Sequence, residues 1–332
     1  MALPHARRSP RPRPPPLRRA CALLLGALLL LWLRLQVLAM SPRANGGAGG
    51  GATPPLLGSP PPPPPRAPAA PKVLTVATGA NSPFFVAMRN LVGSVRFWCP
   101  PDRCRLAVFN LGLSPDELDE ARTWCGANVH WSGGSSGGSP AGNPGNYAFK
   151  ALAVEEAVRD YGHVLWLDAG STVTGRLYES VLPHMLREGA FLVQGQDLDM
   201  VPWVHPGMFR HFEVEDASRF RGLHSYSGNT VGFVAGSAAS AAILPPWVAC
   251  AKNASCIDPP GSNRGNHRYD QAALSVIAYS SGVAITPRTD LLAASRGQLR
   301  PCMEASDMVV WTSRSGESCY TGFTHRGCNG GT

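Results

Sequence analysis

An acidic residue at the end of an apolar segment is the clearest candidate for chemistry in this 332-residue chain. Residues 163–167 read HVLWL, a pattern typical of a buried strand, and Asp168 follows directly. Ligands of open α/β sheets bind beyond the carboxyl ends of the strands. A carboxylate held there can bind a divalent cation or accept a hydrogen bond from a sugar hydroxyl. The alternative is that Asp168 only caps the turn that follows.

A second pattern, Gly133–Gly137, formally matches the G-x-S-x-G motif of serine hydrolases. In those enzymes the serine lies on a turn between an apolar strand and a helix. Here the match lies inside a Gly- and Ser-rich stretch, residues 131–146, without either element around it. We interpret the match as chance, and this makes a tethered hydrolase the least favoured class of function.

The elements that must position Asp168 alternate between strand and helix patterns. Such alternation predicts an α/β fold, with a mainly parallel sheet flanked by helices. The last helical pattern before Asp168 has apolar residues three and four apart and ends at Gly162. The expected strands are 72–77, 105–110 and 163–167, and the expected helices are 83–95, one that begins at a Ser114 cap, and 149–161.

Three short motifs resemble those of GT-A-type glycosyltransferases. Residues 164–171, VLWLDAGS, resemble the segment that carries the D-x-D motif. Residues 229–233, NTVGF, resemble the N-x-G-x strand of the family 8 enzymes related to glycogenin, and residues 267–274, HRYDQAAL, resemble their D-Q-x-x-L segment. The WLDA[GS] and R[YF]DQ patterns are also similar to those of poorly characterised animal proteins. The likeness extends over residues 72–300 and implies a single GT-A-like domain with a mixed, mostly parallel sheet.

The resemblance also implies a donor-binding site. Thr78 and Asn81 would lie at the end of the first strand, near the nucleotide base and ribose. Lys150 would approach a phosphate from the preceding helix. Asp168 would face the donor sugar and any cation, and Asn229 would line the reacting sugar.

The same resemblance gives three candidate catalytic residues, Asp168, Asp270 and Gln271. The chemistry requires an acceptor hydroxyl aligned with the sugar carbon and a carboxylate that accepts its proton. Asp270 is the candidate for this acceptor-side role. Two plainer interpretations stay open: Lys150 as a solvated helix residue, and Asp270 as the cap of a helix that begins at Gln271.

The metal motif is incomplete. The family has a second acid two positions after the first, and here Gly170 occupies that position. Asp168 is therefore the candidate ligand for Mn²⁺ or Mg²⁺, and the usual bidentate arrangement lacks one carboxylate. Two replacements are conceivable. They are the literal D-x-D of Asp197 and Asp199, for which turn residues are the favoured explanation, and His325, near the position where family 8 enzymes often supply a histidine.

The cysteines indicate an oxidising compartment. One of the nine, Cys21, lies in an apolar segment, and the other eight follow it. An even number of cysteines in such a compartment favours disulfides over zinc, and no CxxC or HxxxH spacing supports zinc. The expected short loops are Cys99–Cys104 and Cys250–Cys256, while pairing among Cys125, Cys302, Cys319 and Cys328 stays open. Asn253 begins an N-glycosylation sequon, Asn-Ala-Ser.

The amino-terminal segments predict a type II membrane protein. Residues 20–40 are apolar except for Arg34 and Gln36, and about 20 such residues cross a bilayer as a helix. Six arginines in residues 1–19 place that tail in the cytosol. A cleaved signal peptide is the alternative. Residues 41–71 are rich in Gly, Pro and Ala and predict a stem, which leaves 72–332 as a luminal domain.

The net charge of +8 does not indicate nucleic-acid binding. Residues 1–71 hold nine arginines and no acidic residue. Subtracting these nine from the 30 basic residues leaves 21 against 22 acidic residues in the rest of the chain. No basic stripe is left to follow a phosphate backbone.

These observations predict a Golgi membrane glycosyltransferase, with the hexosyltransferase class favoured by the resemblance. Its partners would be a nucleotide-sugar donor, a glycan, protein or lipid acceptor, and the membrane through one helix. A different class of function is a catalytically inactive GT-A-like domain that serves as a tethered binding module. The glycine at position 170 keeps this alternative open.

Overall fold

The computed structural model describes residues 72–130, 144–195, 197–288, 292–294, 303, 308–312 and 318–328. The predicted tail, anchor and stem lie outside these residues, as does the Gly133–Gly137 pattern. In the part of the chain that is described, no helix is both long and apolar enough to cross a membrane. Pro68–Thr332 forms one compact unit, in agreement with a single domain.

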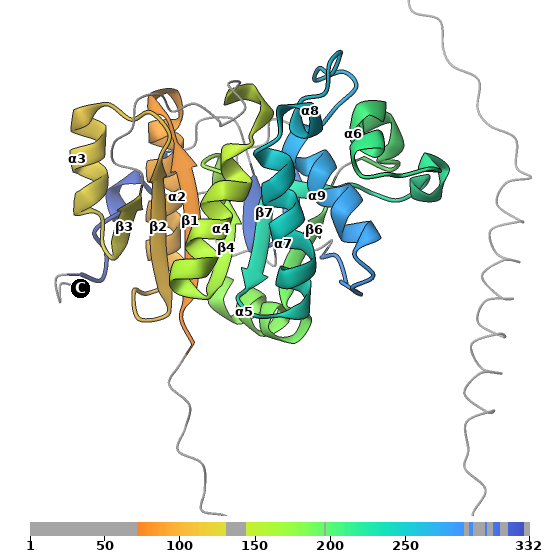
Figure 1. Cartoon of the computed structure of the whole chain (residues 1–332). Helices are drawn as coiled ribbons and strands as arrows, with labels where there is room; N and C mark the ends of the chain where they lie inside the picture. Colours follow the sequence, from red (N-terminus) through yellow and green to blue (C-terminus); the bar gives the residue numbers. More distant parts are fainter. Residues whose placement is uncertain are drawn as a thin grey trace, which may run out of the picture. The chain divides into compact units, whose positions relative to one another are not determined.

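The centre of this unit is a six-stranded mixed sheet with the strand order β3-β2-β1-β4-β7-β6 (Figure 1). β1 pairs in parallel with β2 and β4, β2 pairs in parallel with β3, and β7 is antiparallel to β4 and β6. The predicted mostly parallel sheet is confirmed. The strands are β1 (Leu74–Ala80), β2 (Cys104–Asn110), β3 (Ala127–His130), β4 (His163–Leu167), β6 (Ala190–Gln194) and β7 (Tyr226–Val234).

Helices cover both faces of the sheet. One buried cluster is formed with residues of α4, α7 and α9, and the other with residues of α2 and α5. Figure 1 shows α4 and α7 in front of the sheet. The helices are α2 (Phe85–Trp98), α3 (Pro115–Thr123), α4 (Phe149–Tyr161), α5 (Leu177–Glu188), α6 (Pro206–His211), α7 (Ala238–Ala251), α8 (Ala254–Ile257) and α9 (Tyr269–Ser280), and a small second sheet contains β5 (Ser171–Val173), β8 (Leu292–Ala294) and β9 (Val310–Thr312).

Local sequence explains several of these boundaries. Ser114 accepts a hydrogen bond from the Glu117 backbone N–H, and the Glu117 side chain accepts one from Ser114, which forms a capping box at the start of α3. α4 ends at Gly162, whose φ of 80° is the conformation that glycine adopts without strain. The bounds of α4 and β4 match the prediction. α2 begins later than predicted because residues 82–84 form a 3₁₀ turn.

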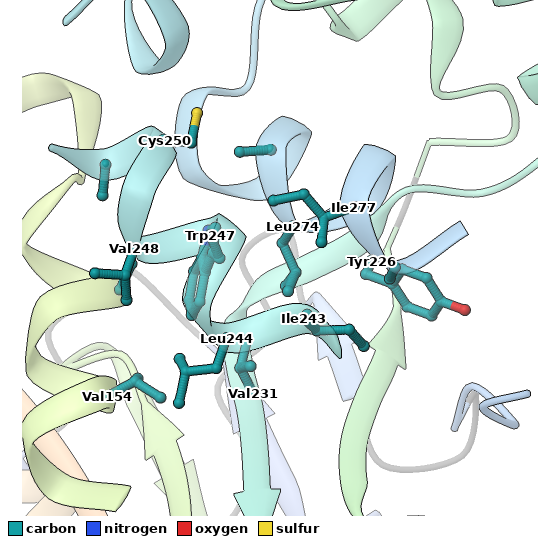
Figure 2. Close-up of a cluster of buried hydrophobic side chains, with 14 of the residues drawn as sticks. Val154, Tyr226, Val231, Ile243, Leu244, Trp247, Val248, Cys250, Leu274 and Ile277 are labelled. Atoms are coloured by element: carbon teal, nitrogen blue, oxygen red, sulfur yellow. The ribbon is translucent and has the colours of Figure 1, made fainter. Parts of the chain in front are cut away.

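The core around α7 holds α9 in place. Trp247 of α7 is buried among side chains of α9 and β7, including Leu274 and Val231 (Figure 2). Burying one large apolar side chain stabilises a fold by roughly 1.5–3 kcal/mol. The indole of Trp247 also donates a hydrogen bond to the backbone oxygen of Asp270 at 3.0 Å. The first turn of α9 is thereby fixed against α7.

Every cysteine in the described residues is part of a disulfide, which excludes zinc for these positions. The predicted pairs Cys99–Cys104 and Cys250–Cys256 are confirmed. Cys125 pairs with Cys328, 203 residues later. Cys319 is also disulfide-bonded. The Cys125–Cys328 bond and the bonded state of Cys319 resolve part of the cysteine pairing that the sequence leaves open.

Candidate active site

The candidate site lies at the edge of the sheet where β4 ends and β7 begins. Because β7 is antiparallel to β4, its first residues lie beside the last residues of β4, and Leu167 is opposite Thr230. The backbone N–H of Asp168 donates to the backbone oxygen of Asn229 at 2.9 Å. Two of the predicted motifs, 61 residues apart, are thus neighbours in the sheet.

α9 brings the third motif to the same edge. The backbone N–H of Tyr226 donates to the Ser275 hydroxyl at 2.9 Å, which ties β7 to α9. α9 begins at Tyr269, one residue before Asp270, and its flanking cap residue is Arg268. Asp270 therefore does not cap the helix, and that plainer interpretation is wrong. Tyr269 has φ 44°, a left-handed conformation that costs energy for a non-glycine residue.

Lys150 joins the two acidic residues. Its Nζ lies 3.1 Å from Asp168 Oδ1 and 2.9 Å from Asp270 Oδ2. It also donates to the backbone oxygen of Gly228 at 2.7 Å. Lys150 is only 3% exposed, so the interpretation of a solvated helix residue is wrong. We call Lys150, Asp168 and Asp270 the lysine–aspartate triad.

Burial and charge act in opposite directions within the triad. Burial by itself lowers the pKa of Lys150, but Asp168 and Asp270 outweigh it and raise that pKa above its ordinary value. Burial raises the pKa of Asp270 to about 6, against the opposing effect of Lys150. Asp270 Oδ2 lies close to Nζ without the alignment of a hydrogen bond, so their contact is mainly one of charge. Lys150 is therefore cationic throughout the physiological range.

The two carboxylates differ in access. The Asp168 side chain is 35% exposed, whereas Asp270 is 4% exposed. Asp168 Oδ1 accepts a hydrogen bond from the Trp166 indole at 2.7 Å in addition to its contact with Lys150. Asp168 Oδ2 accepts a long hydrogen bond from Lys150 Nζ at 3.5 Å. Asp168 is consequently the carboxylate of the triad that a ligand reaches, and its orientation is fixed by two donors.

Gln271 lies next to the triad in a separate hydrogen-bond network. Its Nε2 donates to Ser225 Oγ at 2.8 Å and approaches Asp197 Oδ2 at 3.3 Å, and Ser225 Oγ donates to Asp197 Oδ2 at 2.9 Å. This arrangement leaves the Gln271 carbonyl oxygen as the acceptor end of the amide. Asp199 instead accepts from the Val201 backbone N–H at 2.9 Å, as a turn residue does. The literal D-x-D pair therefore does not act as one unit.

The candidate nucleotide residues lie at the carboxyl end of β1. Thr78 is fully buried within the strand. Asn81 directly follows β1 and is half-buried, and its Oδ1 has no hydrogen-bond partner among the described residues. Asn229 is half-buried, and its Oδ1 accepts from Ser227 Oγ at 2.6 Å. Asn81 Oδ1 and Thr78 Oγ1 are both buried and have no hydrogen-bond partner among the described residues, and the Asn81 residue is the more exposed of the two.

Among the residues that the structure describes, the side chains around Asp168 do not form a usual divalent-metal site. Gly170 supplies no ligand, and the Lys150 ammonium already occupies the position between the two carboxylates. His325 follows Thr324, whose backbone oxygen accepts from Cys125 N at 2.9 Å, near the amino end of β3. Asp168 follows the carboxyl end of β4, so His325 lies toward the opposite edge of the sheet and does not replace the missing acid.

Another group of possible metal ligands occurs in the described residues, formed by His130, Glu156 and Asp160. Both ring nitrogens of His130 already have partners. Nδ1 lies 2.9 Å from Glu156 Oε1, and Nε2 lies 2.8 Å from the Tyr161 hydroxyl. This group does not include Asp168.

Gly228 is a residue of the site that the sequence analysis did not single out. A Cβ at this position would lie 2.8 Å from Asp270 Oδ2 and 3.4 Å from Lys150 Nζ. A glycine inside a strand often marks a close approach of another group, and this signal is present in the sequence. Tyr147 is a second site residue that the sequence analysis did not single out. Its ring centroid lies 5.5 Å from Lys150 Nζ, and its φ is 58°.

No protein-family model and no curated protein matches the chain. Several solved structures resemble it at low identity. GlyE of Streptococcus pneumoniae TIGR4, a glycosyltransferase, has a TM-score of 0.38 and 13% identity over 63% of this chain and 44% of its own. The galactosyltransferase LgtC in complex with donor and acceptor sugar analogs has a TM-score of 0.32 and 14% identity, over 53% of this chain and 59% of its own. Mouse xyloside xylosyltransferase 1 has a TM-score of 0.44 and 11% identity, over 74% of this chain and 98% of its own.

The first two structures found are longer than the region they share with this chain. The chain spans 44% of GlyE and 39% of the bifunctional glycosyltransferase WbbM. Because their TM-scores are below 0.5, these similarities carry no argument here, and the function is argued below from the residues of the site.

Proposed function

We propose that this protein is a glycosyltransferase that uses a nucleotide-sugar donor and that the lysine–aspartate triad lies at its active site. The observation that carries the proposal is the meeting of three segments distant in sequence. Lys150 of α4, Asp168 after β4 and Asp270 of α9 contact one another at the edge of the sheet. Ligands of open α/β sheets bind at this kind of edge.

The geometry suggests different roles for the polar residues of the site. Asp168, the accessible carboxylate, would hydrogen-bond the donor sugar or accept the proton of the acceptor hydroxyl. Gln271 would present its carbonyl oxygen to the same region, with Asn229 beside it. Because Asp270 is buried and contacts Lys150, we assign it a positioning role instead of contact with substrate. Asn81, and Thr78 behind it, would lie on the nucleotide side.

The proposed reaction needs little covalent participation from the protein. The bond between the sugar carbon and the diphosphate oxygen breaks, and its electron pair leaves with the nucleoside diphosphate. The acceptor oxygen forms the new bond to the sugar carbon and gives its proton to a carboxylate. The protein contributes alignment of the two substrates and charge that stabilises the departing diphosphate.

The proposed setting is the Golgi lumen, with the anchor at 20–40 and the sequon at Asn253 as support. Asn253 is exposed, at the start of α8 and within the Cys250–Cys256 loop. A glycosidase-sensitive mass that is lost in Asn253→Gln, with the domain protected from protease in intact microsomes, would support this topology. Complete digestion in intact microsomes would contradict it. The acceptor class is a glycan, a protein or a lipid, and a hexose is the favoured sugar.

The proposal is tested with the full chain from a secretory host, purified in detergent. A panel of nucleotide-sugars is screened for release of the nucleoside diphosphate, with Mn²⁺, with Mg²⁺ and with EDTA. We expect one donor to be turned over and Asp168→Ala to reduce that turnover by about 100-fold or more, the lower range for loss of a general base. Asp116→Ala, at an exposed position of α3, is the matched control.

The competing function is an inactive GT-A-like domain that binds without catalysis. Gly170 is the observation that favours it, because one expected acid is missing. Donor binding without turnover, in a folded protein, would support that alternative. Neither binding nor turnover with any donor would sink the enzyme proposal.

A further inference from the structure

We propose that Arg264 and Arg268, on the loop between α8 and α9, bind the diphosphate of the donor and stabilise it as a leaving group without a metal ion. This inference rests on the proposed function. It adds the cations that this function needs and that the triad does not supply.

The starting point is that Lys150 is already engaged by two carboxylates and one backbone oxygen. Its three nearest acceptors are Asp168, Asp270 and the backbone oxygen of Gly228, at 3.1, 2.9 and 2.7 Å. With both carboxylates ionised, the triad carries a net charge of −1. A diphosphate is therefore not stabilised by Lys150, contrary to the expectation that this residue approaches a phosphate.

The carboxylates of the site do not offer the usual alternative for stabilising a diphosphate, which is a bound divalent cation. A divalent cation would need carboxylate ligands, and Gly170 removes one of them. Placing a cation between Asp168 and Asp270 would require it to displace the Lys150 ammonium from both. Positive charge for a diphosphate must then come from other side chains near this edge.

Arg264 contacts Tyr147, the same aromatic residue that Lys150 of the triad contacts. Its Nη2 donates to the Tyr147 hydroxyl at 3.0 Å, and its Cζ lies 5.8 Å from the centroid of that ring. Lys150 Nζ lies 5.5 Å from the same centroid. Arg264 is exposed and makes no ion pair with any described residue. A guanidinium has five N–H donors in a planar fork that matches phosphate oxygens.

Arg268 lies two residues before Asp270 on the same loop. Its guanidinium stacks on the Trp203 ring at 3.9 Å from the centroid, and its backbone N–H donates to the Trp203 backbone oxygen at 3.0 Å. It is half-buried and, within the described part of the chain, also lacks a carboxylate partner. Stacking of this kind fixes the plane of a guanidinium. Arg268 Nη1 donates to the Arg264 backbone oxygen at 3.4 Å, and a phosphate would take the remaining N–H groups of the fork.

The loop that carries Arg264 is held by its own hydrogen bonds. Asn263 Oδ1 accepts from the Gly265 backbone N–H at 2.8 Å. The Asn266 side chain accepts from the Asn263 backbone N–H at 2.7 Å and donates to the Gly261 backbone oxygen at 3.2 Å. Preorganised donors stabilise charge in a transition state more than mobile ones do. The loop thus presents Arg264 from a defined backbone.

The experiment measures binding of UDP, GDP and inorganic pyrophosphate to the full chain by calorimetry, in EDTA and in Mn²⁺. The variants are Arg264→Ala, Arg268→Ala and Arg264→Lys. Arg122→Ala is the control, because Arg122 is an exposed arginine of α3. Thermal unfolding of each variant is recorded to show that it is folded.

We expect nucleoside diphosphate binding in EDTA to weaken by about 10-fold or more in Arg264→Ala and in Arg268→Ala, the effect of losing one charge-assisted hydrogen bond. Arg264→Lys should recover part of this loss, and Arg122→Ala should bind as the wild type does. The neutral nucleoside should bind all variants equally.

Two results would overturn the inference while the proposed function stands. One is binding in EDTA that is unchanged in both alanine variants. The other is wild-type binding and turnover that occur only with Mn²⁺. Absence of any nucleotide binding and any turnover under every condition would instead overturn the proposed function, and this inference with it.

Discussion

At the residue scale, the site depends on a balance between burial and charge. A buried lysine or aspartate without a partner would lose several kcal/mol of hydration, and pairing recovers that cost only with good geometry. Lys150 is placed between two carboxylates and a backbone oxygen, which is enough to keep it cationic. Asp270 is the member of the triad in which burial outweighs the opposing charge of Lys150, since its pKa is raised to about 6.

The raised pKa of Asp270 predicts a pH-dependent stability. Its ordinary pKa is 3.8 and its folded value is about 6, so between these values the folded protein holds a proton that the unfolded chain has lost. The contribution of Asp270 to stability is therefore largest below pH 4 and is lost as the pH rises through 6. Urea unfolding at pH 4, 5, 6 and 7 measures it.

We expect the unfolding free energy of wild type minus that of Asp270→Asn to decrease by about 2–3 kcal/mol between pH 4 and 7, from about 1.4 kcal/mol per pKa unit. Asp116→Asn, which changes an exposed carboxylate of α3, is the control measured over the same pH range. A difference that grows with pH would mean that Lys150 lowers the pKa of Asp270 more than burial raises it.

At the element scale, three segments converge because of the direction of β7. Its antiparallel pairing with β4 puts its first residues beside Asp168, and α9 packs on the same strand. β7 comes close to the side chains of α4 and α9 at Gly228. Gly228 lets its strand approach Asp270 and Lys150 within van der Waals distance. A side chain at that position would separate α9 from the strand.

Gly228→Ala tests this close approach. The added Cβ would lie 2.8 Å from Asp270 Oδ2, too near for an unstrained contact. We expect the unfolding free energy to fall by about 1–3 kcal/mol, the usual cost of overpacking, and donor turnover to be largely lost. Denaturant unfolding and the release assay measure the two effects.

Gly322→Ala provides the comparison, because no atom lies within 4 Å of the Cβ position there. It should leave both stability and turnover near wild type. If Gly228→Ala behaved like this control, the contact between β7 and the triad would be looser than described.

At the scale of the whole molecule, one disulfide joins two segments that are far apart in the sequence. Cys125 precedes β3, at one side of the sheet, and Cys328 lies close to the carboxyl terminus. The segment around Cys328 packs on α2, where Gly93 directly meets the backbone of Tyr320. Most of the domain is therefore enclosed in one disulfide loop.

The length of this loop predicts unequal effects of two disulfides. In the chain-entropy description, closing 203 residues stabilises the fold by about 5 kcal/mol, whereas closing a loop as short as Cys99–Cys104 contributes about 2 kcal/mol. We expect Cys125→Ser with Cys328→Ser to lower the unfolding free energy clearly more than Cys99→Ser with Cys104→Ser. Guanidinium unfolding of both double variants decides this, and equal losses would contradict the entropic explanation.

Features of this protein that depend on neighbours along the chain were predictable from the sequence alone. The bounds of α4 and β4, the Ser114 cap and the two short disulfides all arise from contacts within a few residues. The mostly parallel sheet also followed, because alternating strands and helices have few other ways to pack.

The tertiary structure decided what lies between distant segments. Hydrophobic periodicity does not show that Lys150 is buried, since its burial depends on contacts with Gly228 of β7 and Asp270 of α9. Nor does it show that Asp270 faces Lys150 instead of capping a helix, or that Cys125 pairs with Cys328. These facts depend on strand order and direction, which arise from contacts between residues far apart in the chain. The chemistry of the site was thus present in the residue types, and its geometry came from the packing.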